Sequence, residues 1–296
     1  MNGRVGYWSH GVLETVKRAL HAVKTTAHSI SGGMGLFVIL LFMVCAMFAG
    51  TLATHDPFVQ DAEAQSVSPN REHFLGTDDL GRDLFSRVVH GSRISLKIGI
   101  ISVAIAMLVG VPVGLVSGYF AGRIDMFVMR FIDILMAFPG ILLAIIIMAV
   151  LGPSLTNMMI AVGIVNIPQY ARQVRASVLD IKELEFVLAS RAVGATDTRI
   201  LLKTIFPNTI SPILVLATLG IGTAILEAAG LSFLGLGGQP AMPEWGNMLR
   251  SAREHLRSSP WIPLAPGVAI SLTVLGFNLF GDALRDVIDP KGRRRE

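Results

Sequence analysis

The chain has 296 residues, of which 52% are hydrophobic and only 16% are charged, and its mean hydropathy is +0.61. This balance excludes an ordinary water-soluble domain and indicates an integral membrane protein. The net charge of +4 and the pI near 9.5 could point to a nucleic-acid partner, but the basic residues alternate from loop to loop, which is a membrane topology signal.

Six apolar segments are long enough to cross about 30 Å of hydrocarbon as helices. They cover residues 34–52, 94–120, 131–151, 155–170, 209–233 and 262–284. The fourth segment is the weakest because two asparagines and Pro168 interrupt its apolar run. A long polar stretch precedes the first segment, so we expect a membrane helix there rather than a cleaved signal peptide. The sequence therefore predicts an all-α membrane protein with six transmembrane helices.

The orientation of these helices follows from the loops between them. With the N-terminus in the cytoplasm, most of the 25 Lys and Arg residues lie on the cytoplasmic side, as the positive-inside rule requires. The C-terminus is then cytoplasmic as well. The chain divides into a cytoplasmic segment 1–33, a first helix and outer loop 34–93, a transmembrane core 94–290, and a basic tail 291–296. The tail is expected to anchor the inner face rather than bind nucleic acid.

Small residues recur at every fourth position in the second apolar segment. Gly110, Gly114, Gly118 and Gly122 share one face of a helix, where the absence of side chains lets another helix approach closely. We expect a helix-packing stripe along all four glycines.

The two long outer loops, 75–87 and 234–261, carry patterned residues. Thr77 or Asp78 is expected to cap a helix that leads into the second span. The acidic and basic side chains beside it could form a metal or catalytic site, but carboxylates next to arginines are more often paired with them, which favours a fixed docking or scaffold loop. In the second loop, Pro243 or Glu244 is expected to begin a short helix on the membrane surface, with Trp245 at the interface. The candidates for docking or scaffolding are Gly76, Thr77, Asp78, Gly81, Arg82, Asp83, Pro243, Glu244, Trp245 and Gly246.

A polar, helix-patterned element at 172–207 lies on the cytoplasmic side between two apolar segments. Its apolar spacing predicts one continuous amphipathic helix from Arg172 to Val193, which Gly194 ends as a C-cap. Thr196 or Asp197 would then cap a second short helix that stops at Pro207. Small residues before the glycine would let another protein approach. The element could therefore be a docking corner, or a helix pair that rests on lipid headgroups.

Other chemistry is sparse in the sequence. Glu227 lies within an apolar span, so it is either a pathway residue near the outer gate or a carboxylate hydrogen-bonded between helices. The chain has no G-x-x-x-x-G-K-[ST] loop for ATP phosphates, and Gly235, Gly237 and Gly238 lack the lysine. The seven histidines show no metal-ligand spacing, and no nucleophile motif appears. We therefore expect no metal site, no bound cofactor and no enzymatic activity.

Residues 189–207 resemble the cytoplasmic signature of ABC importer permeases, which reads Glu-Ala-Ala, three residues, Gly, nine residues, Ile-x-Leu-Pro. Ala189, Gly194 and Pro207 match this signature, whereas Leu188 stands in place of its glutamate. Three further positions depart from it, namely Ser190, Thr204 and Phe206. The stretches 75–87, 227–237 and 243–246 resemble the C-type permease subunit of dipeptide, oligopeptide and nickel importers.

This resemblance implies a type I ABC importer permease in the bacterial inner membrane. Such a subunit forms half of a pore with a homologous second permease, while two ATPase subunits hold ATP and Mg and an extracytoplasmic binding protein delivers the substrate. The ATPase-coupling residues would be Leu188, Ala189, Ser190, Ala192, Gly194, Ala195, Thr196 and Pro207.

The substrate is left open by the sequence. Short peptides are favoured, and nickel or another small solute is the alternative. A gradient-driven secondary transporter is less favoured because the chain has no internal repeat. An integral-membrane enzyme is disfavoured because no catalytic motif is present.

Overall fold

The computed structural model of the protein describes residues 23–239 and 241–288, so the basic tail and most of the segment 1–33 lie outside the described residues. Within the described residues the chain is helical, and its one β-bridge pairs Thr77 with Asp83. The helices are α2 (Ile30–Met47), α3 (Ala49–Leu52), α4 (Leu84–Phe120), α5 (Gly122–Ala137), α6 (Gly140–Leu151), α7 (Leu155–Lys182), α8 (Glu185–Ala192), α9 (Asp197–Ile200), α10 (Phe206–Phe233), α11 (Trp245–Ala252) and α12 (Trp261–Ile288). Short 3₁₀ turns lie at η1 (Ala62–Ala64) and η3 (Arg253–His255), and a π-helical turn lies at η2 (Leu201–Ile205).

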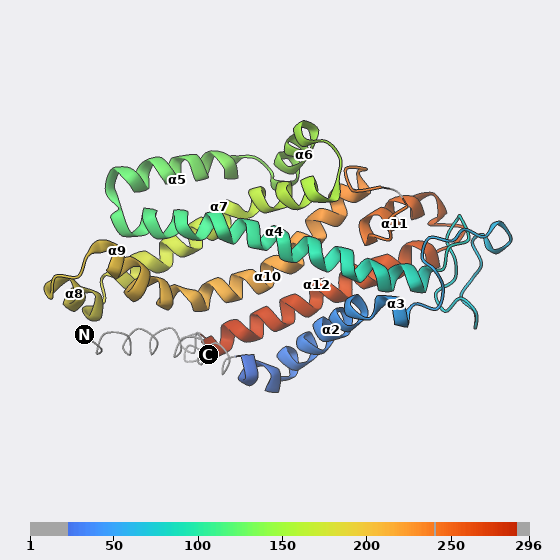
Figure 1. Ribbon diagram of the computed structural model, residues 1–296, viewed down its shortest axis with the longest axis horizontal. Helices are drawn as coiled ribbons and strands as arrows, with labels where there is room; N and C mark the ends of the chain where they lie inside the picture. The colour runs from blue at the N-terminus through green and yellow to red at the C-terminus, as the bar shows by residue number, and fades with distance from the viewer. Residues whose placement is uncertain (1–22, 240, 289–296) are drawn as a thin grey trace, which may run out of the picture.

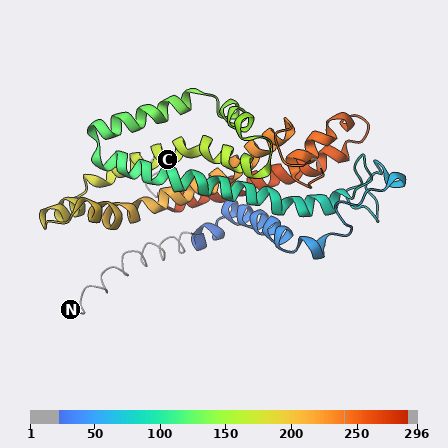
Figure 2. The ribbon, with the colours of Figure 1, turned by 45° about the horizontal axis from the view of Figure 1, so that its top comes forward.

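The long helices α4, α7, α10 and α12 run along one axis and form the body of the molecule (Figure 1). Helix α2 packs against α12 and α4 on one face, and α5 and α6 lie on the opposite face, as the turned view in Figure 2 also shows. Helices α8 and α9 form one end of the long axis. The loop before α4 and helix α11 form the other end. We call these the corner end and the outer end.

The number of membrane-crossing helices is only partly settled by length and composition. Four described helices are long and apolar enough to cross a membrane, namely α2, α4, the continuous helix Asp197–Phe233, and α12. The bent pair of α5 and α6 counts as a fifth if it forms one span. The predicted fourth span is the first part of α7, which is longer and more polar than expected. Six spans therefore remain a prediction.

The third predicted span, 131–151, is not one straight helix. The chain bends by 92° between α5 and α6. Phe138 has an extended backbone, with ψ of 136°, and Pro139 follows it without an N–H to continue the hydrogen-bond ladder of α5. The predicted span 131–151 is therefore bent rather than a single helix, and the apolar pattern did not predict this local stop.

The glycine stripe on α4 packs against α7. A Cβ on Gly110 would lie 2.7 Å from the Cβ of Tyr170, and one on Gly114 would lie 2.5 Å from the carbonyl oxygen of Ala171. A Cβ on Gly118 would lie 2.8 Å from the Cβ of Val178. Gly122 does not belong to the stripe, because a Cβ there would meet nothing within 4 Å and the residue begins α5 with φ of +57°. Three of the four predicted glycines therefore bring the helices together.

The buried apolar residues form clusters along the long axis. At the outer end Trp245 and Phe42 lie among residues from α2, α4, α10 and α12. A middle cluster joins α4, α6, α7 and α10 around Met148 and Met158. At the corner end Val178 and Ile200 share a cluster with residues of α4 and α8. These clusters fix both ends of the molecule to the same set of long helices.

Candidate functional site

The predicted C-cap at Gly194 is confirmed. Gly194 has φ of +79°, its N–H donates to the carbonyl of Arg191 at 3.0 Å, and the N–H of Ala195 donates to the carbonyl of Ser190 at 3.1 Å. These two bonds form a Schellman motif, which glycine favours because its backbone adopts this left-handed conformation without strain. The chain therefore makes a fixed turn between α8 and α9.

The helix before this turn is not continuous, contrary to the prediction. Helix α7 ends at Lys182, Leu184 is extended with ψ of 147°, and α8 begins at Glu185. The break buries Val187 in the same cluster as Val178. In one straight helix these two residues would be about 13 Å apart along the axis, whereas the break lets the chain turn before Val187 is buried. Leu184 and Leu188, which continue the apolar spacing of this segment in the sequence, are both nearly half exposed.

The predicted stop at Pro207 was also wrong. The helix begins after Thr196, whose side chain makes no capping hydrogen bond, and continues from Asp197 through the π-helical turn at η2 and on to Phe233. In this turn the N–H of Phe206 donates to the carbonyl of Leu201, five residues back. The widened turn shifts the hydrogen-bond pattern directly before Pro207 and lets the proline sit in the first turn of α10, where its missing N–H is tolerated.

Most of the predicted coupling residues are exposed at the corner end. Leu188, Ala189, Ala192, Gly194 and Thr196 are exposed, and a Cβ on Gly194 would meet nothing within 4 Å. The half-buried members are Ser190, Ala195 and Pro207. A hollow of about 340 Å³ lies beside them and is lined by Ser190, Val193, Gly194, Ala195, Arg199, Lys203 and Thr204. The corner thus presents a surface that no other described part of the chain covers.

Buried contacts hold the corner rigidly to the long helices. Val187 and Ile200, on either side of the turn, are fully buried. The hydroxyl of Tyr119, near the end of α4, donates to a carboxylate oxygen of Asp197 at 2.6 Å. The sequence did not point to Tyr119 or Asp197 as partners, since they lie far apart along the chain. Because buried residues fix the exposed corner to the long helices, a movement of the corner can be transmitted to α4, α7 and α10.

The predicted pairing of acids with arginines is confirmed at the outer end. Asp78 accepts from Nε of Arg82 at 2.7 Å and lies 3.6 Å from Nε of Arg87, and all three side chains are buried. The guanidinium of Arg87 also donates to the carbonyl of Pro57 at 2.9 Å. A buried carboxylate between two buried guanidiniums holds a loop in place, because none of the charges can be left unpaired cheaply.

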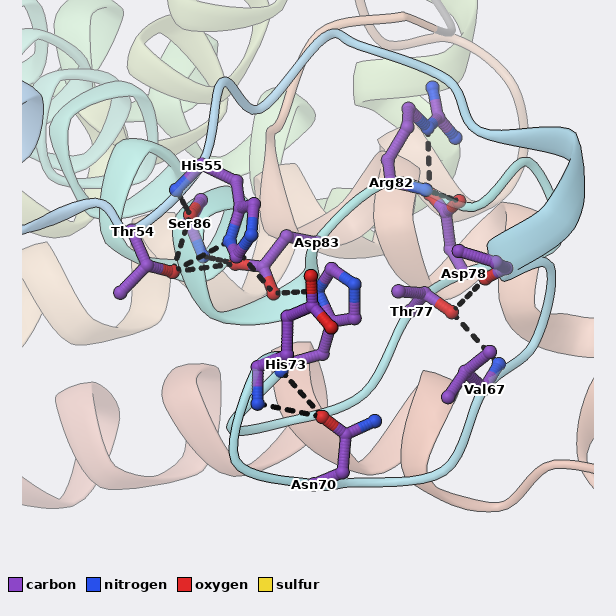
Figure 3. Close-up of polar contacts among 12 residues, drawn as sticks. Thr54, His55, Val67, Asn70, His73, Thr77, Asp78, Arg82, Asp83 and Ser86 are labelled. Carbon is purple, nitrogen blue, oxygen red and sulfur yellow. Dashed lines mark hydrogen bonds and ion pairs between the residues drawn. The ribbon is translucent and has the colours of Figure 1, made fainter.

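The helix cap in this loop lies later than predicted. Asp83, rather than Thr77 or Asp78, caps α4, and its Oδ2 accepts from the N–H of Ser86 at 2.8 Å. Thr77 instead accepts from the N–H of Val67 at 2.8 Å and pins an earlier part of the loop. The other carboxylate oxygen of Asp83 lies 2.9 Å from Nδ1 of His73 (Figure 3). Several residues of this loop could act as caps, and only the three-dimensional pairing decides among them.

Glu244 caps α11 as predicted, and Trp245, which was expected at an interfacial depth, is buried within the chain. Glu244 accepts from the N–H groups of Gly246 and Asn247, both at 2.8 Å. Burial raises the pKa of the Glu244 carboxyl, although these two backbone donors partly oppose the rise. Trp245 is fully buried, its ring packs edge-on against Phe42 at 5.3 Å, and its Nε1–H donates to the carbonyl of Val88 at 3.0 Å.

All ten outer candidates are buried in the chain. They bring the stretches 75–87 and 243–246 together with the end of α10. A Cβ on Gly91 of α4 would lie 2.6 Å from the carbonyl oxygen of Pro243, and one on Gly246 would lie 2.7 Å from the Cα of Ala229. Buried side chains cannot contact a docking protein directly, so the arrangement favours the scaffold interpretation over direct docking.

Glu227 has a partner on a neighbouring helix. Nδ2 of Asn166, on α7, donates to Oε2 of Glu227, on α10, at 2.8 Å. The same amide also donates to the carbonyl of Val162 at 2.9 Å. Asn166 is one of the two asparagines that interrupt the apolar run of the predicted fourth span. It therefore pairs with Glu227, the acidic residue of the predicted fifth span.

Comparison with known proteins agrees with this architecture. Residues 110–294 match the family described as binding-protein-dependent transport system inner membrane components. The chain belongs to this family: it is the permease component of an ABC importer and a multi-pass protein of the bacterial inner membrane.

Named relatives lie within the same family. The chain is 49% identical over 258 residues to the dipeptide transport system permease protein DppC of Alkalihalophilus pseudofirmus, covering 87% of this chain and 85% of that protein. It is 47% identical over 258 residues to the glutathione transport system permease protein GsiD of Pectobacterium atrosepticum, with the same coverage. It is 44% identical over 271 residues to the di/tripeptide transport system permease protein DppC of Pseudomonas aeruginosa, covering 90% and 89%.

Solved structures support the fold. A structure of the MetNI methionine ABC transporter in an inward-facing conformation matches with a TM-score of 0.57 and 21% identity, covering 68% of this chain and 96% of that one. At this identity the match supports the helical arrangement alone.

Proposed function

We propose that this chain forms half of the translocation pathway of an importer for short peptides, together with a homologous second permease. Two ATPase subunits would bind at the corner end, and an extracytoplasmic binding protein would deliver the peptide at the outer end. The observation that carries this proposal is the exposed corner around Gly194, which is fixed to the long helices by buried residues on both sides.

The corner would act by seating in a cleft of an ATPase subunit. When the ATPase dimer closes on ATP, the corner would move with it and rotate the long helices, so that an inward-facing pore becomes outward-facing. Leu188 stands where the family signature has a glutamate, so the contact would depend on shape and backbone groups rather than on that charge. ATP and Mg would stay on the partner subunits.

The outer end would receive the binding protein on its exposed surface. Since the ten outer candidates are buried, they would hold this surface in place rather than touch the binding protein. Glu227 would lie near the outer part of the pathway, where its bond to Asn166 fixes the position of its carboxylate.

The relatives' names support peptides as the cargo. They include dipeptide, di/tripeptide and glutathione permeases, and glutathione is itself a small peptide. A nickel or other small-solute importer is the alternative within the same family. A gradient-driven secondary transporter is disfavoured by the match of residues 110–294 to a binding-protein-dependent family.

Substitution of Gly194 tests the coupling. Gly194→Trp adds bulk to the exposed turn, and we expect ATP hydrolysis to continue while peptide uptake into vesicles falls at least about tenfold per ATP hydrolysed. Gly194→Ala is the matched control, because it imposes the same strained φ but its Cβ meets nothing within 4 Å. An unchanged ratio of uptake to hydrolysis in Gly194→Trp would remove the corner from the mechanism.

Affinity purification in mild detergent tests the assembly. We expect two ATPase subunits and a second permease to co-purify with the chain. A lone homo-oligomer that transports peptides without ATP would contradict the importer proposal. Screening peptides and Ni²⁺ against the partner binding protein would distinguish the two cargo classes.

A further inference from the structure

We propose that His55, Glu72 and His73 form a binding site for one zinc-class divalent metal ion in the first outer loop. The site would lie where the chain leaves α3 and where it turns toward α4. Two imidazole nitrogens and a carboxylate oxygen are a donor set that suits Zn²⁺, which binds such ligands at about 2.0 to 2.2 Å. The proposal rests on this chain's own residues and is independent of the transported substrate.

The three side chains converge although they come from two segments of the loop. The rings of His55 and His73 have centroids 4.7 Å apart and are tilted by 34°. One ligand atom from each histidine and one carboxylate oxygen of Glu72 all lie within 4.8 Å of one another. Ligands of a tetrahedral zinc ion are about 3.4 Å apart, so the ligand atoms must approach one another by up to about 1.4 Å. Glu72 is exposed and His55 is 37% exposed, so both can make this adjustment.

Asp83 orients His73 through its ring nitrogen. The Asp83 side chain is only 1% exposed, and its Oδ1 lies 2.9 Å from Nδ1 of His73. Nδ1 of His55 lies 3.0 Å from Oγ1 of Thr54 and 3.9 Å from the same carboxylate oxygen. A carboxylate at Nδ1 keeps the proton on that nitrogen and leaves Nε2 with its lone pair available for a metal. Carboxylate–histidine pairs of this kind are typical of zinc sites, where they fix the orientation of the ring.

The backbone that carries the ligands is held firmly. The side-chain oxygen of Asn70 accepts from the N–H groups of Glu72 and His73, both at 2.8 Å (Figure 3). The N–H of His55 donates to Oγ of Ser86 at 3.0 Å, which ties that residue to the first turn of α4. A site built on such constrained segments loses little conformational freedom when the metal binds.

A purely structural explanation accounts for only part of this arrangement. The bond between His73 and Asp83 could serve only to fasten the loop to the cap of α4. Fastening the loop to α4 does not require the side chains of His55 and Glu72 to lie beside His73. The two explanations differ in their predictions, because only a metal site makes His55 and Glu72 matter for the binding of an ion.

Zinc binding by the intact transporter tests the proposal. The complex would be purified with a tag that lacks histidine, stripped with a chelator, and titrated with Zn²⁺ in competition with a chromophoric chelator. We expect the wild type to bind one more equivalent of Zn²⁺ per chain than the variant His55→Gln/Glu72→Gln. Each single change should weaken this binding about tenfold or more. In the wild type, Co²⁺ should give the absorption bands of a tetrahedral site.

Matched controls separate the site from general effects on the loop. Glu63→Gln removes an exposed acid from the same loop, and His28→Gln removes an exposed histidine elsewhere; neither should change Zn²⁺ affinity by more than about twofold. Because His55 and Glu72 are solvent-accessible, their variants should keep the thermal stability of the metal-free wild type. Equal zinc content and affinity in the wild type and the double variant would overturn the proposal, as would a wild type that binds no Zn²⁺.

Discussion

The close approach of α4 and α7 predicts that a single added methyl group at Gly114 destabilises the protein. A Cβ there would lie 2.5 Å from the carbonyl oxygen of Ala171 and 2.8 Å from the Cβ of Val174. Ordinary contacts of a Cβ begin at about 3.4 Å, so the two helices would have to separate by about 1 Å. Gly110 and Gly118 hold the same pair of helices together one turn away on each side, and they oppose this separation.

The magnitude follows from two opposing effects. Overpacking of a tight core position destabilises by about 1 to 3 kcal/mol. Alanine is a better helix former than glycine, which offsets about 1 kcal/mol of this destabilisation. Gly114→Ala should therefore lower the free energy of unfolding by up to about 2 kcal/mol, and by about 1 to 3 kcal/mol relative to a helical glycine-to-alanine change that meets no close contact. The expected change is large enough to measure but small enough to leave the protein folded.

Thermal or denaturant unfolding of the purified complex in detergent measures this effect. Gly230→Ala is the matched control, because a Cβ at this helical glycine of α10 would come no closer than 3.7 Å to its nearest neighbour. The control should unfold at the same temperature as the wild type or slightly above it. If Gly114→Ala proved as stable as Gly230→Ala, the inference that the glycine stripe sets the spacing of α4 and α7 would be refuted.

Three further predictions concern the outer end, and all use the same unfolding measurement. Asp78→Asn leaves the buried guanidiniums of Arg82 and Arg87 without their counter-charge and should destabilise by about 3 kcal/mol, whereas Asp79→Asn should change stability by less than about 0.5 kcal/mol. Trp245→Phe keeps an aromatic ring but removes the donor to the carbonyl of Val88, which should lower stability by about 1 to 2 kcal/mol. Because burial raises the pKa of Glu244 in the folded state above its ordinary value of 4.5, the folded state holds this proton more tightly; the resulting stabilisation is complete below pH 4.5 and is lost as the pH rises through the folded pKa. As the pH rises from 4.5 through the folded pKa, the wild type should therefore lose stability relative to Glu244→Gln. A stability difference between the two proteins that does not change with pH would contradict the raised pKa of Glu244.

The sequence predictions were correct where residues that lie close together in the sequence decide the structure. The turn at Gly194 and the cap at Glu244 depend on residues within four positions, so the sequence predicts them well. The glycines of α4 were identified because a four-residue spacing defines a helix face wherever the helix lies. The acid–arginine pairing around Asp78 was likewise predictable from close spacing.

Features that depend on distant contacts could not be predicted. The break before α8 exists because Val187 is buried against residues of other helices, and the continued helix at Pro207 depends on a π-helical turn that no residue type specifies. Trp245 is buried because Phe42, some two hundred residues earlier in the sequence, packs against its ring. His55 and His73 showed no ligand spacing in the sequence, since the loop between them brings their rings together.

The continuous helix Asp197–Phe233 joins the corner to the outer half of the molecule in one rod of 37 residues. At 1.5 Å per residue its length is about 55 Å, so a tilt of about 10° at one end displaces the other end by nearly 10 Å. A small rotation imposed near Gly194 would thus be magnified close to Glu227. Spin labels for distance measurements are therefore best placed at the far end of this lever, where the same motion gives the largest signal.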